Sequence, residues 1–369
     1  MEIILFIVSF LFVFGLLVLV HEFGHFIVAK ISKVGVLEFG FGFPPAIYKK
    51  KIGETVYSIN AIPFGGFVKL LGEDGSQKDN PRSLSVQSNL TKAKIISAGV
   101  VMNMVLAWFI FSSLYIVGFH SLIPGTENHL GVKEHTYIAE VEKGTPAAEK
   151  GILAKDEVLE INGKKIKNAD EFVEGVRGKI GQEVKIKIKR EQAIKEFTVI
   201  PFKGKVEGKE FGRIGVAVDK KVQADDILLA PVAGLAESFR LAGMTIVGLF
   251  QFFGKIFTFK LGEEAVGPVG IAVLTNQVRQ LGFSFLLQFI AILSISLALL
   301  NIMPIPALDG GHLFLILIEK TRGKELSLKL KNILTIVGFV FLIALVIVIT
   351  TKDLSRFGVI DSLKKLFGF

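Results

Sequence analysis

The sequence predicts a polytopic α-helical membrane protein with four transmembrane helices, a membrane-associated β-hairpin and an inserted soluble α+β domain. Hydrophobic residues make up 51% of the 369 residues, which is more than an ordinary soluble globular protein carries. Several windows of about 18 or more residues hold few charges, so each is long enough to cross roughly 30 Å of hydrocarbon. A charge-rich stretch between these windows indicates the soluble domain.

The first predicted span covers residues 3–30 and is followed by Lys30, Lys33 and Lys49 to Lys51. These cations place its C-terminal end in the cytoplasm by the positive-inside rule, so its N-terminus lies outside. Glu2 stands where a signal peptide would carry positive charge, and no small-residue cleavage site follows the span. We therefore expect a retained helix.

Residues 21–25 read HEFGH and fit the pattern H-E-x-x-H. On a helix, His21 and His25 lie on one face and can bind one metal ion, while Glu22 can stand beside a water molecule that completes the site. The chain has no cysteine, so the metal must be held by histidine and carboxylate, which favours one Zn²⁺ per chain. Glu22 is then the predicted catalytic general base. Ionisable groups in an apolar span usually mark function.

Such a site needs a third ligand, and the candidate is Asp309, an aspartate close to an apolar span at a matching depth. Pro304 and Pro306 break the helix before it, and a glycine pair follows it, which suits a carboxylate that must reach sideways to a metal. His312 is a rival ligand. A lone histidine near the membrane surface is, however, more often a polar residue at a helix end.

The depth of Asp309 also bears on the number of spans. Residues 241–259 are long enough to cross the membrane, but they carry Lys255. If they crossed, Asp309 would reach the outer surface, away from His21 and His25. We therefore expect residues 241–259 to lie along the outer face and both chain termini to lie outside. The predicted spans are about 3–30, 95–119, 283–318 and 333–350.

Residues 54–72 predict a β-hairpin, with Gly65 and Gly66 as its turn. Its apolar face suits a re-entrant hairpin, provided that other protein covers its backbone. A small soluble sheet fits the pattern equally well. The predicted organisation is a first membrane half at 1–124, a soluble domain at 125–221, outer-face interfacial helices at 222–282 and a second membrane half at 283–369.

The soluble region closely resembles a PDZ domain. The resemblance rests on the strand TYIAEV, the helix start at Thr145 to Ala148 and the turn Ile161-Asn162-Gly163. Such domains add a peptide strand to an open sheet edge, so this resemblance implies an extracytoplasmic domain that binds a peptide or a substrate tail.

Four features of the chain form one pattern: HExxH, the sequence GxxxN from Gly99 to Asn103, NxxPxPxLDG from Asn301 and the inserted domain. Together they resemble the site-2 protease family of intramembrane zinc metalloproteases, of the regulator of sigma E type. This resemblance covers nearly the whole chain, with one PDZ domain in place of two. It implies that His21, His25 and Asp309 bind zinc and that Glu22 is the base. It also implies substrate binding by Asn301 and, in the hairpin, by Tyr57, Ile59, Gly65, Gly66 and Phe67.

The expected function is cleavage of a single-span membrane protein, such as an anti-sigma factor, in the bacterial inner membrane, with the active site near the cytoplasmic side. The expected partners are this substrate, a peptide at the PDZ domain and the lipid bilayer. The net charge of +9 does not predict nucleic-acid binding, because the cations cluster beside apolar segments. Two alternatives stay open: a catalytically silent PDZ-bearing scaffold with a structural metal, against which the intact Glu22 argues, and a metal transporter, which would need further intramembrane ligands.

Overall fold

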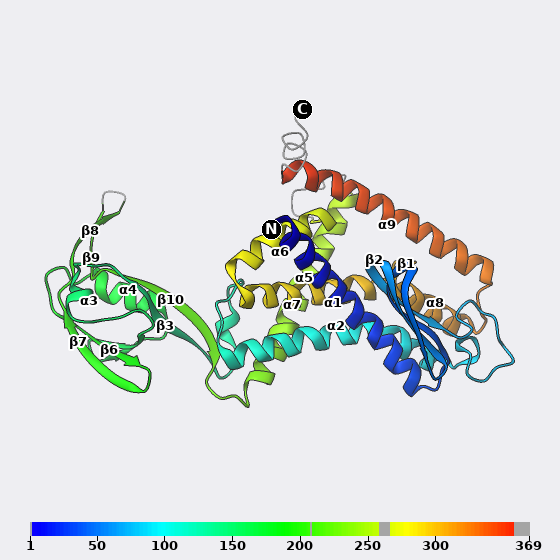
Figure 1. Ribbon diagram of the computed structural model, residues 1–369, viewed down its shortest axis with the longest axis horizontal. Helices are drawn as coiled ribbons and strands as arrows, with labels where there is room; N and C mark the ends of the chain where they lie inside the picture. Colours follow the sequence, from blue (N-terminus) through cyan, green and yellow to red (C-terminus); the bar gives the residue numbers. More distant parts are fainter. Residues whose placement is uncertain (1, 207–208, 258–265, 358–369) are drawn as a thin grey trace. The chain divides into compact units, whose positions relative to one another are not determined.

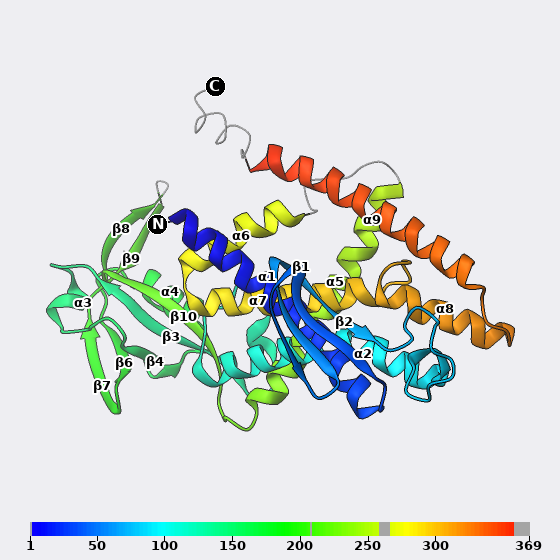
Figure 2. The same cartoon turned by 45° about the vertical axis from the view of Figure 1, so that its right-hand side comes forward.

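The structure is a computed structural model that describes residues 2–206, 209–257 and 266–357. It consists of two compact units (Figures 1 and 2). The membrane unit combines the residues up to Ile110 with those from Ser238 onward, and the inserted unit is Phe111–Glu237. Parts of the predicted outer-face region (258–265) and of the second membrane half (358–369) lie outside the described residues.

Five of the described helices are long and apolar enough to cross a membrane. They are α1 (Glu2–Ile31), α2 (Asn89–Val117), α5 (Ala230–Phe257), α7 (Phe283–Ile302) and α9 (Leu328–Arg356). The chain is therefore a multi-pass membrane protein. The four predicted spans leave out one of these five helices, α5. The number of four spans therefore stays a prediction.

Two helices belong to the predicted outer-face region. In both views α5 runs crosswise to α2, α7 and α9 (Figures 1 and 2). The shorter α6 (Pro268–Leu281) packs against α1, α7 and α9. Its first turn is held by the buried carboxylate of Asp353 in α9, whose Oδ2 accepts hydrogen bonds from the backbone N–H groups of Gly267 (3.0 Å) and Gly270 (2.8 Å). This carboxylate satisfies N–H groups that a helix start leaves unpaired.

The predicted third span at 283–318 is broken in the structure. Helix α7 ends at Ile302, and α8 begins at Asp309 and runs to Arg322. The prolines at 304 and 306 cannot continue the hydrogen-bond ladder of the helix. The chain then turns back on itself so closely that a Cβ atom at Gly310 would lie 2.2 Å from the carbonyl oxygen of Ile302. Asp309 is therefore the first residue of a new helix that is packed against the end of the old one.

The β-hairpin is larger than predicted. Strand β1 (Val36–Ile52) takes in the Gly-rich FGFGF stretch, and β2 is Thr55–Leu70. The chain reverses at Gly53 and Glu54, where Gly53 has a φ of +63°, and it reverses again between residues 59 and 66, because residues 56–59 and 66–70 run in opposite directions beside residues 36–41. The predicted turn at Gly65 and Gly66 lies at the end of this second reversal. Gly65, with a φ of +98°, lies at this second reversal, which falls within the range of β2.

The two long strands pair with each other along two registers. Residues 36–41 lie between residues 66–70 on one side and residues 56–59 on the other, so Phe39 is opposite both Val68 and Tyr57. Residues 46–52 complete the sheet opposite 55–60. Residues 66–70 therefore form one edge of this sheet, and residues 46–52 form the other.

The hairpin is fixed to the end of α1. Ala29, Val36 and Leu70 are buried in one hydrophobic cluster with Val34 and Ile95. At the turn, the Glu54 carboxylate bridges Arg82 (2.6 Å) and Lys30 (2.9 Å), and these two cations lower the pKa of Glu54 to about 2. The loop from β2 to α2 includes the short 3₁₀ helix η1 (Leu84–Val86).

Helices α1 and α2 touch backbone to backbone. A Cβ atom at Gly24 would lie 2.4 Å from the carbonyl oxygen of Ala98, and a Cβ atom at Gly99 would lie 2.5 Å from Nε2 of His25. Real Cβ atoms do not approach other atoms this closely. In an apolar span, glycine lets two helices approach in this way.

The inserted unit is built on a sheet with the strand order β10-β3-β4-β6-β7, and β5 pairs with β4. Its core comprises Ile138, Val158, Phe172, Ile186 and Ile188, among others. The observed strand β3 includes the predicted strand TYIAEV. The elements are η2 (Thr126–Asn128), β3 (Val132–Val141), α3 (Pro146–Glu149), β4 (Glu157–Ile161), β5 (Lys164–Lys165), α4 (Ala169–Arg177), β6 (Val184–Arg190), β7 (Ala193–Val199), β8 (Phe202–Val206), β9 (Lys209–Arg213) and β10 (Val216–Ala224).

The helix crossing gives a stability prediction. Gly24→Ala forces α1 and α2 apart, so we expect the protein to lose about 1–3 kcal/mol of unfolding free energy. Gly248→Ala in α5 is the matched control, because an added Cβ there meets nothing within 4 Å. The control should be neutral or gain up to about 1 kcal/mol from helix propensity. Thermal unfolding of the full chain in detergent measures both, and equal melting temperatures would contradict the proposed crossing.

Candidate metal centre and active site

His21 and His25 lie one turn apart near the C-terminal end of α1 and point their Nε2 atoms toward each other. The two Nε2 atoms are 3.2 Å apart, and the rings meet edge to face with their centroids 4.8 Å apart. His21 is buried and His25 is largely buried. Two imidazoles in an apolar span need polar partners, because hydrocarbon offers none.

The third member of this cluster is Asp309, at the start of α8. Its Oδ2 lies 3.1 Å from Nε2 of His21 and 3.3 Å from Nε2 of His25. Oδ2 is buried and makes no hydrogen bond among the described residues. The structure thus brings together the two histidines and the aspartate that the sequence predicts to meet, although they lie nearly 300 residues apart in the chain.

The dimensions of this cluster fit zinc. Its three atoms are separated by 3.1, 3.2 and 3.3 Å, and a tetrahedral zinc site with bonds of roughly 2.0–2.2 Å separates its ligand atoms by about 3.4 Å. Two imidazole nitrogens and one carboxylate oxygen form a common donor set for catalytic zinc, with one position left open. Among the described residues, these three histidine and acidic side chains lie close enough together to hold one metal ion.

Helix α2 orients both histidine rings from behind. Nδ1 of His25 lies 2.8 Å from the carbonyl oxygen of Ile95, and Nδ1 of His21 lies 3.5 Å from the side-chain amide of Asn103. Gly99 makes room for both rings between these two points. The Nε2 atoms are thereby left to face Asp309.

Glu22 follows His21 directly, so it projects about 100° further round the helix. Its side chain is half-buried, and its Cγ would be 3.3 Å from a Cβ atom placed at Gly66. The edge of the hairpin sheet therefore passes beside Glu22. Asn301, at the end of α7, places its Nδ2 3.4 Å from Nε2 of His21.

Two of the other predicted hairpin residues, Tyr57 and Ile59, lie in a different segment of the sheet. Tyr57 packs its ring against Phe26 and Phe39, and Ile59 is exposed. Both belong to the 56–59 segment, which residues 36–41 separate from the edge at 66–70. Of the remaining two, Phe67 packs on Gly40 and Gly65 packs on the ring of Phe43. Gly66 is thus the predicted hairpin residue that the structure brings to Glu22.

Sequence reasoning missed three contributors to this site. Gly24 occupies an "x" of HExxH, and its close contact with α2 could have been suspected from its size. The contribution of Ile95 is a backbone carbonyl, which any residue offers, so no signal in the sequence could have found it. Ser294 donates a hydrogen bond to the backbone carbonyl of Asn103 (2.8 Å), and it stands as a small polar residue inside an apolar run.

Residues 9–345 match the profile of peptidase family M50. The chain belongs to this family. The resemblance to site-2 proteases is thus confirmed, and the protein is an enzyme, a zinc metalloprotease, so the scaffold and transporter alternatives are set aside.

Bacterial proteins match the chain over most of its length. A Clostridium perfringens protein whose name describes it as a zinc metalloprotease is 35% identical to this chain. The match covers 95% of this chain and 98% of the relative. The zinc metalloprotease RasP of Oceanobacillus iheyensis is 29% identical, covering 95% and 99% of the two chains. The regulator of sigma-W protease RasP of Bacillus subtilis is 28% identical, covering 95% and 98%.

Among solved structures, part of the chain is similar to the PDZ domain of an SdrC-like protein of Listeria monocytogenes. The two are 26% identical over 22% of this chain and 85% of that one, with a TM-score of 0.21. The corresponding domain from Listeria innocua is 31% identical over 23% and 92% of the two chains, with a TM-score of 0.20.

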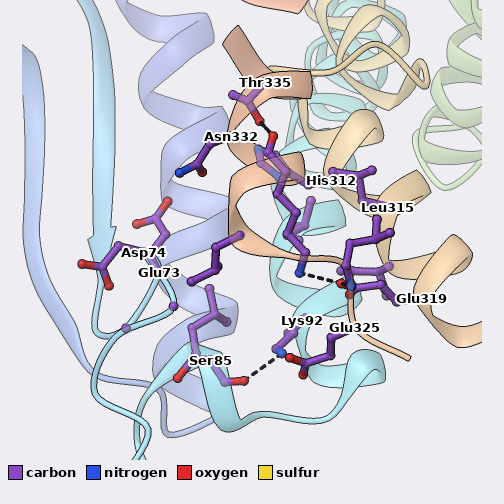
Figure 3. Close-up of a pocket in the computed structure, with 18 of the residues that line it drawn as sticks. Glu73, Asp74, Ser85, Lys92, His312, Leu315, Glu319, Glu325, Asn332 and Thr335 are labelled. Atoms are coloured by element: carbon purple, nitrogen blue, oxygen red, sulfur yellow. Dashed lines mark hydrogen bonds and ion pairs between the residues drawn. The ribbon is translucent and has the colours of Figure 1, made fainter. Parts of the chain in front are cut away.

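The rival ligand His312 lies elsewhere. Figure 3 shows it among the side chains of a cavity of about 240 Å³ between the loop after β2, α8 and α9. Glu73, Glu319 and Lys92 line the same cavity, in which Lys331 pairs with Glu319 at 2.7 Å. His312 thus follows Asp309 by about one helical turn but is not part of the compact group of His21, His25 and Asp309.

These positions predict different effects on metal binding. His25→Ala and Asp309→Ala should each weaken zinc binding by more than the roughly 10–100-fold that loss of an outer-shell partner costs. His312→Ala should keep the zinc of the wild type. Elemental analysis of the detergent-purified full chain after gel filtration measures this. Zinc retained by Asp309→Ala, or lost from His312→Ala, would show that the ligand set is different.

Proposed function

We propose that this zinc metalloprotease cleaves a peptide bond within or near the transmembrane segment of a single-span membrane protein, as a step of regulated intramembrane proteolysis. The observation that carries the proposal is the cluster of His21, His25 and Asp309 on helices of the membrane unit. A protease that placed these ligands outside the bilayer would not need a hydrophobic helix to hold them.

The proposed chemistry divides between one bound zinc per chain and the residues around it. Zinc held by His21, His25 and Asp309 supplies Lewis acidity and makes water easier to deprotonate. Glu22 takes a proton from the attacking water through its carboxylate and then passes it to the amide nitrogen of the leaving group. Asn301, whose Nδ2 lies beside the cluster, donates a hydrogen bond to the substrate backbone.

A helical substrate hides its carbonyl groups, so it must be unwound before it is cleaved. The sheet edge at residues 66–70 offers backbone N–H and C=O groups to an extended chain. Gly66 on this edge packs beside Glu22, so a strand added there would pass the general base. Phe67 lies on this edge and Gly65 directly precedes it, whereas Tyr57 and Ile59 act from within the sheet by supporting the edge.

We also propose how the chain sits in the membrane. Four spans, α1, α2, α7 and α9, with α5 along the outer face, bring Asp309 to the same depth as His21 and His25. The crosswise course of α5 in Figures 1 and 2 supports this arrangement. The lysines after α1 then place the active site near the cytoplasmic side of the bacterial inner membrane, with the inserted unit outside.

The inserted unit supports a role in selecting the substrate. Strand β10 ends the sheet, and beside it lies an apolar cavity of about 130 Å³ lined by residues that include Phe172, Val176 and Val218. We propose that a peptide or substrate tail adds here as a strand. The name of the Bacillus subtilis relative refers to regulation of a sigma factor, which favours an anti-sigma factor as the substrate.

The mechanism predicts separate effects on zinc and on cleavage. Glu22→Gln removes the proton acceptor but leaves His21, His25 and Asp309 in place. It should therefore keep zinc and lower the rate of cleavage of a single-span test substrate in proteoliposomes by about 100-fold or more. Glu325→Gln, which changes an exposed carboxylate of the same unit, is the matched control.

The control should cleave at the rate of the wild type. Cleavage by Glu22→Gln at the wild-type rate would overturn the role of Glu22. A wild type that cuts only soluble peptides, and never the bilayer-embedded substrate, would overturn the intramembrane substrate.

A further inference from the structure

Asn103 lies directly behind the metal cluster and is fully buried. It sits on α2 one turn after Gly99, and its side-chain amide faces Nδ1 of His21, with Nδ2 3.5 Å away. Its backbone carbonyl accepts a hydrogen bond from the hydroxyl of Ser294, which is also fully buried, in α7. Asn103 thus links α1, α2 and α7 at the level of the site.

Metal binding through Nε2 decides whether Nδ1 of His21 donates or accepts a hydrogen bond in its contact with Asn103. Nε2 of His21 faces His25 and Asp309, so a metal held there takes the lone pair of Nε2. A neutral imidazole that coordinates through Nε2 carries its proton on Nδ1 and needs an acceptor for it. For His25 that acceptor is the carbonyl oxygen of Ile95, at 2.8 Å.

The side-chain amide of Asn103 can supply the acceptor for His21. Its Oδ1 is buried and has no hydrogen-bond partner among the described residues, while Nδ2, a donor, faces Nδ1. A buried carbonyl without a partner is costly. Because the two ends of an amide have nearly the same shape, a half-turn of the group places Oδ1 against the N–H of Nδ1. One rotation thus pairs the orphaned oxygen and gives His21 its acceptor.

We propose that Asn103 is a positioning residue of the metal site: its Oδ1 accepts the Nδ1–H of His21 and holds Nε2 toward the metal, and Ser294 holds the backbone of Asn103 in place. This inference rests on the proposed zinc site. It assigns a physical role to the GxxxN stretch, in which Gly99 admits the two rings and Asn103 orients one of them.

The test measures metal affinity in the full chain, with Zn²⁺ alone as the probe in competition with a chromophoric chelator. Asn103→Leu keeps the approximate volume and removes the acceptor, so it should weaken zinc binding about 10–100-fold. Asn103→Asp restores an acceptor at the same position and should bind zinc close to the wild-type level. Co²⁺ substitution gives a second readout, because the visible spectrum of Asn103→Leu should differ from those of the wild type and Asn103→Asp.

Ser294→Ala is the control, because it leaves the Asn103 amide unchanged and should weaken zinc binding less than Asn103→Leu does. Metal-free melting temperatures establish that each variant is folded. If Asn103 had a purely structural role, the folded variants Asn103→Leu and Asn103→Asp would weaken zinc binding equally. That result would overturn the proposal. Unchanged zinc binding in Asn103→Leu would also overturn it. Absence of zinc from the wild type would instead overturn the proposed metal site.

Discussion

The site depends on one constraint: the Asp309 carboxylate, from near the end of the chain, must reach the two imidazoles of His21 and His25 in α1. Any one of these three groups alone would be costly in hydrocarbon. Together they present three donor atoms 3.1–3.3 Å apart, which suits a single zinc ion. The break between α7 and α8 meets this constraint, because α8 starts at Asp309 and its carboxylate lies beside both histidines.

Close backbone contacts make the arrangement possible. Gly24 and Gly99 let α1 and α2 meet without side chains between them, and Gly310 lets α8 start against the end of α7. Each of these glycines gives up the packing that a larger side chain would provide. In return, the ligand-bearing elements approach closely enough for short polar contacts. The cluster is thus positioned by backbone geometry as much as by its own side chains.

The chemistry was more predictable from the sequence than the backbone that supports it. The spacing of HEFGH and the depth of Asp309 predicted which side chains would meet, because helix periodicity and bilayer thickness are strong constraints. The hairpin was harder to predict. Its first turn, at Gly53 and Glu54, follows the charged run at Lys49 to Lys51, which looks like a cytoplasmic flank rather than a strand. The carbonyl of Ile95 was invisible, because backbone groups leave no trace in a sequence.

The split origin of the metal site also has a consequence for biosynthesis. The histidine pair leaves the ribosome early, whereas Asp309 follows about 280 residues later, a delay of roughly 15–60 s at ordinary rates of translation. Until α8 is made, the nascent chain carries two of the three proposed ligands, His21 and His25. With the proposed ligand set, a protease assembled in this order has an incomplete metal site while it is being synthesised.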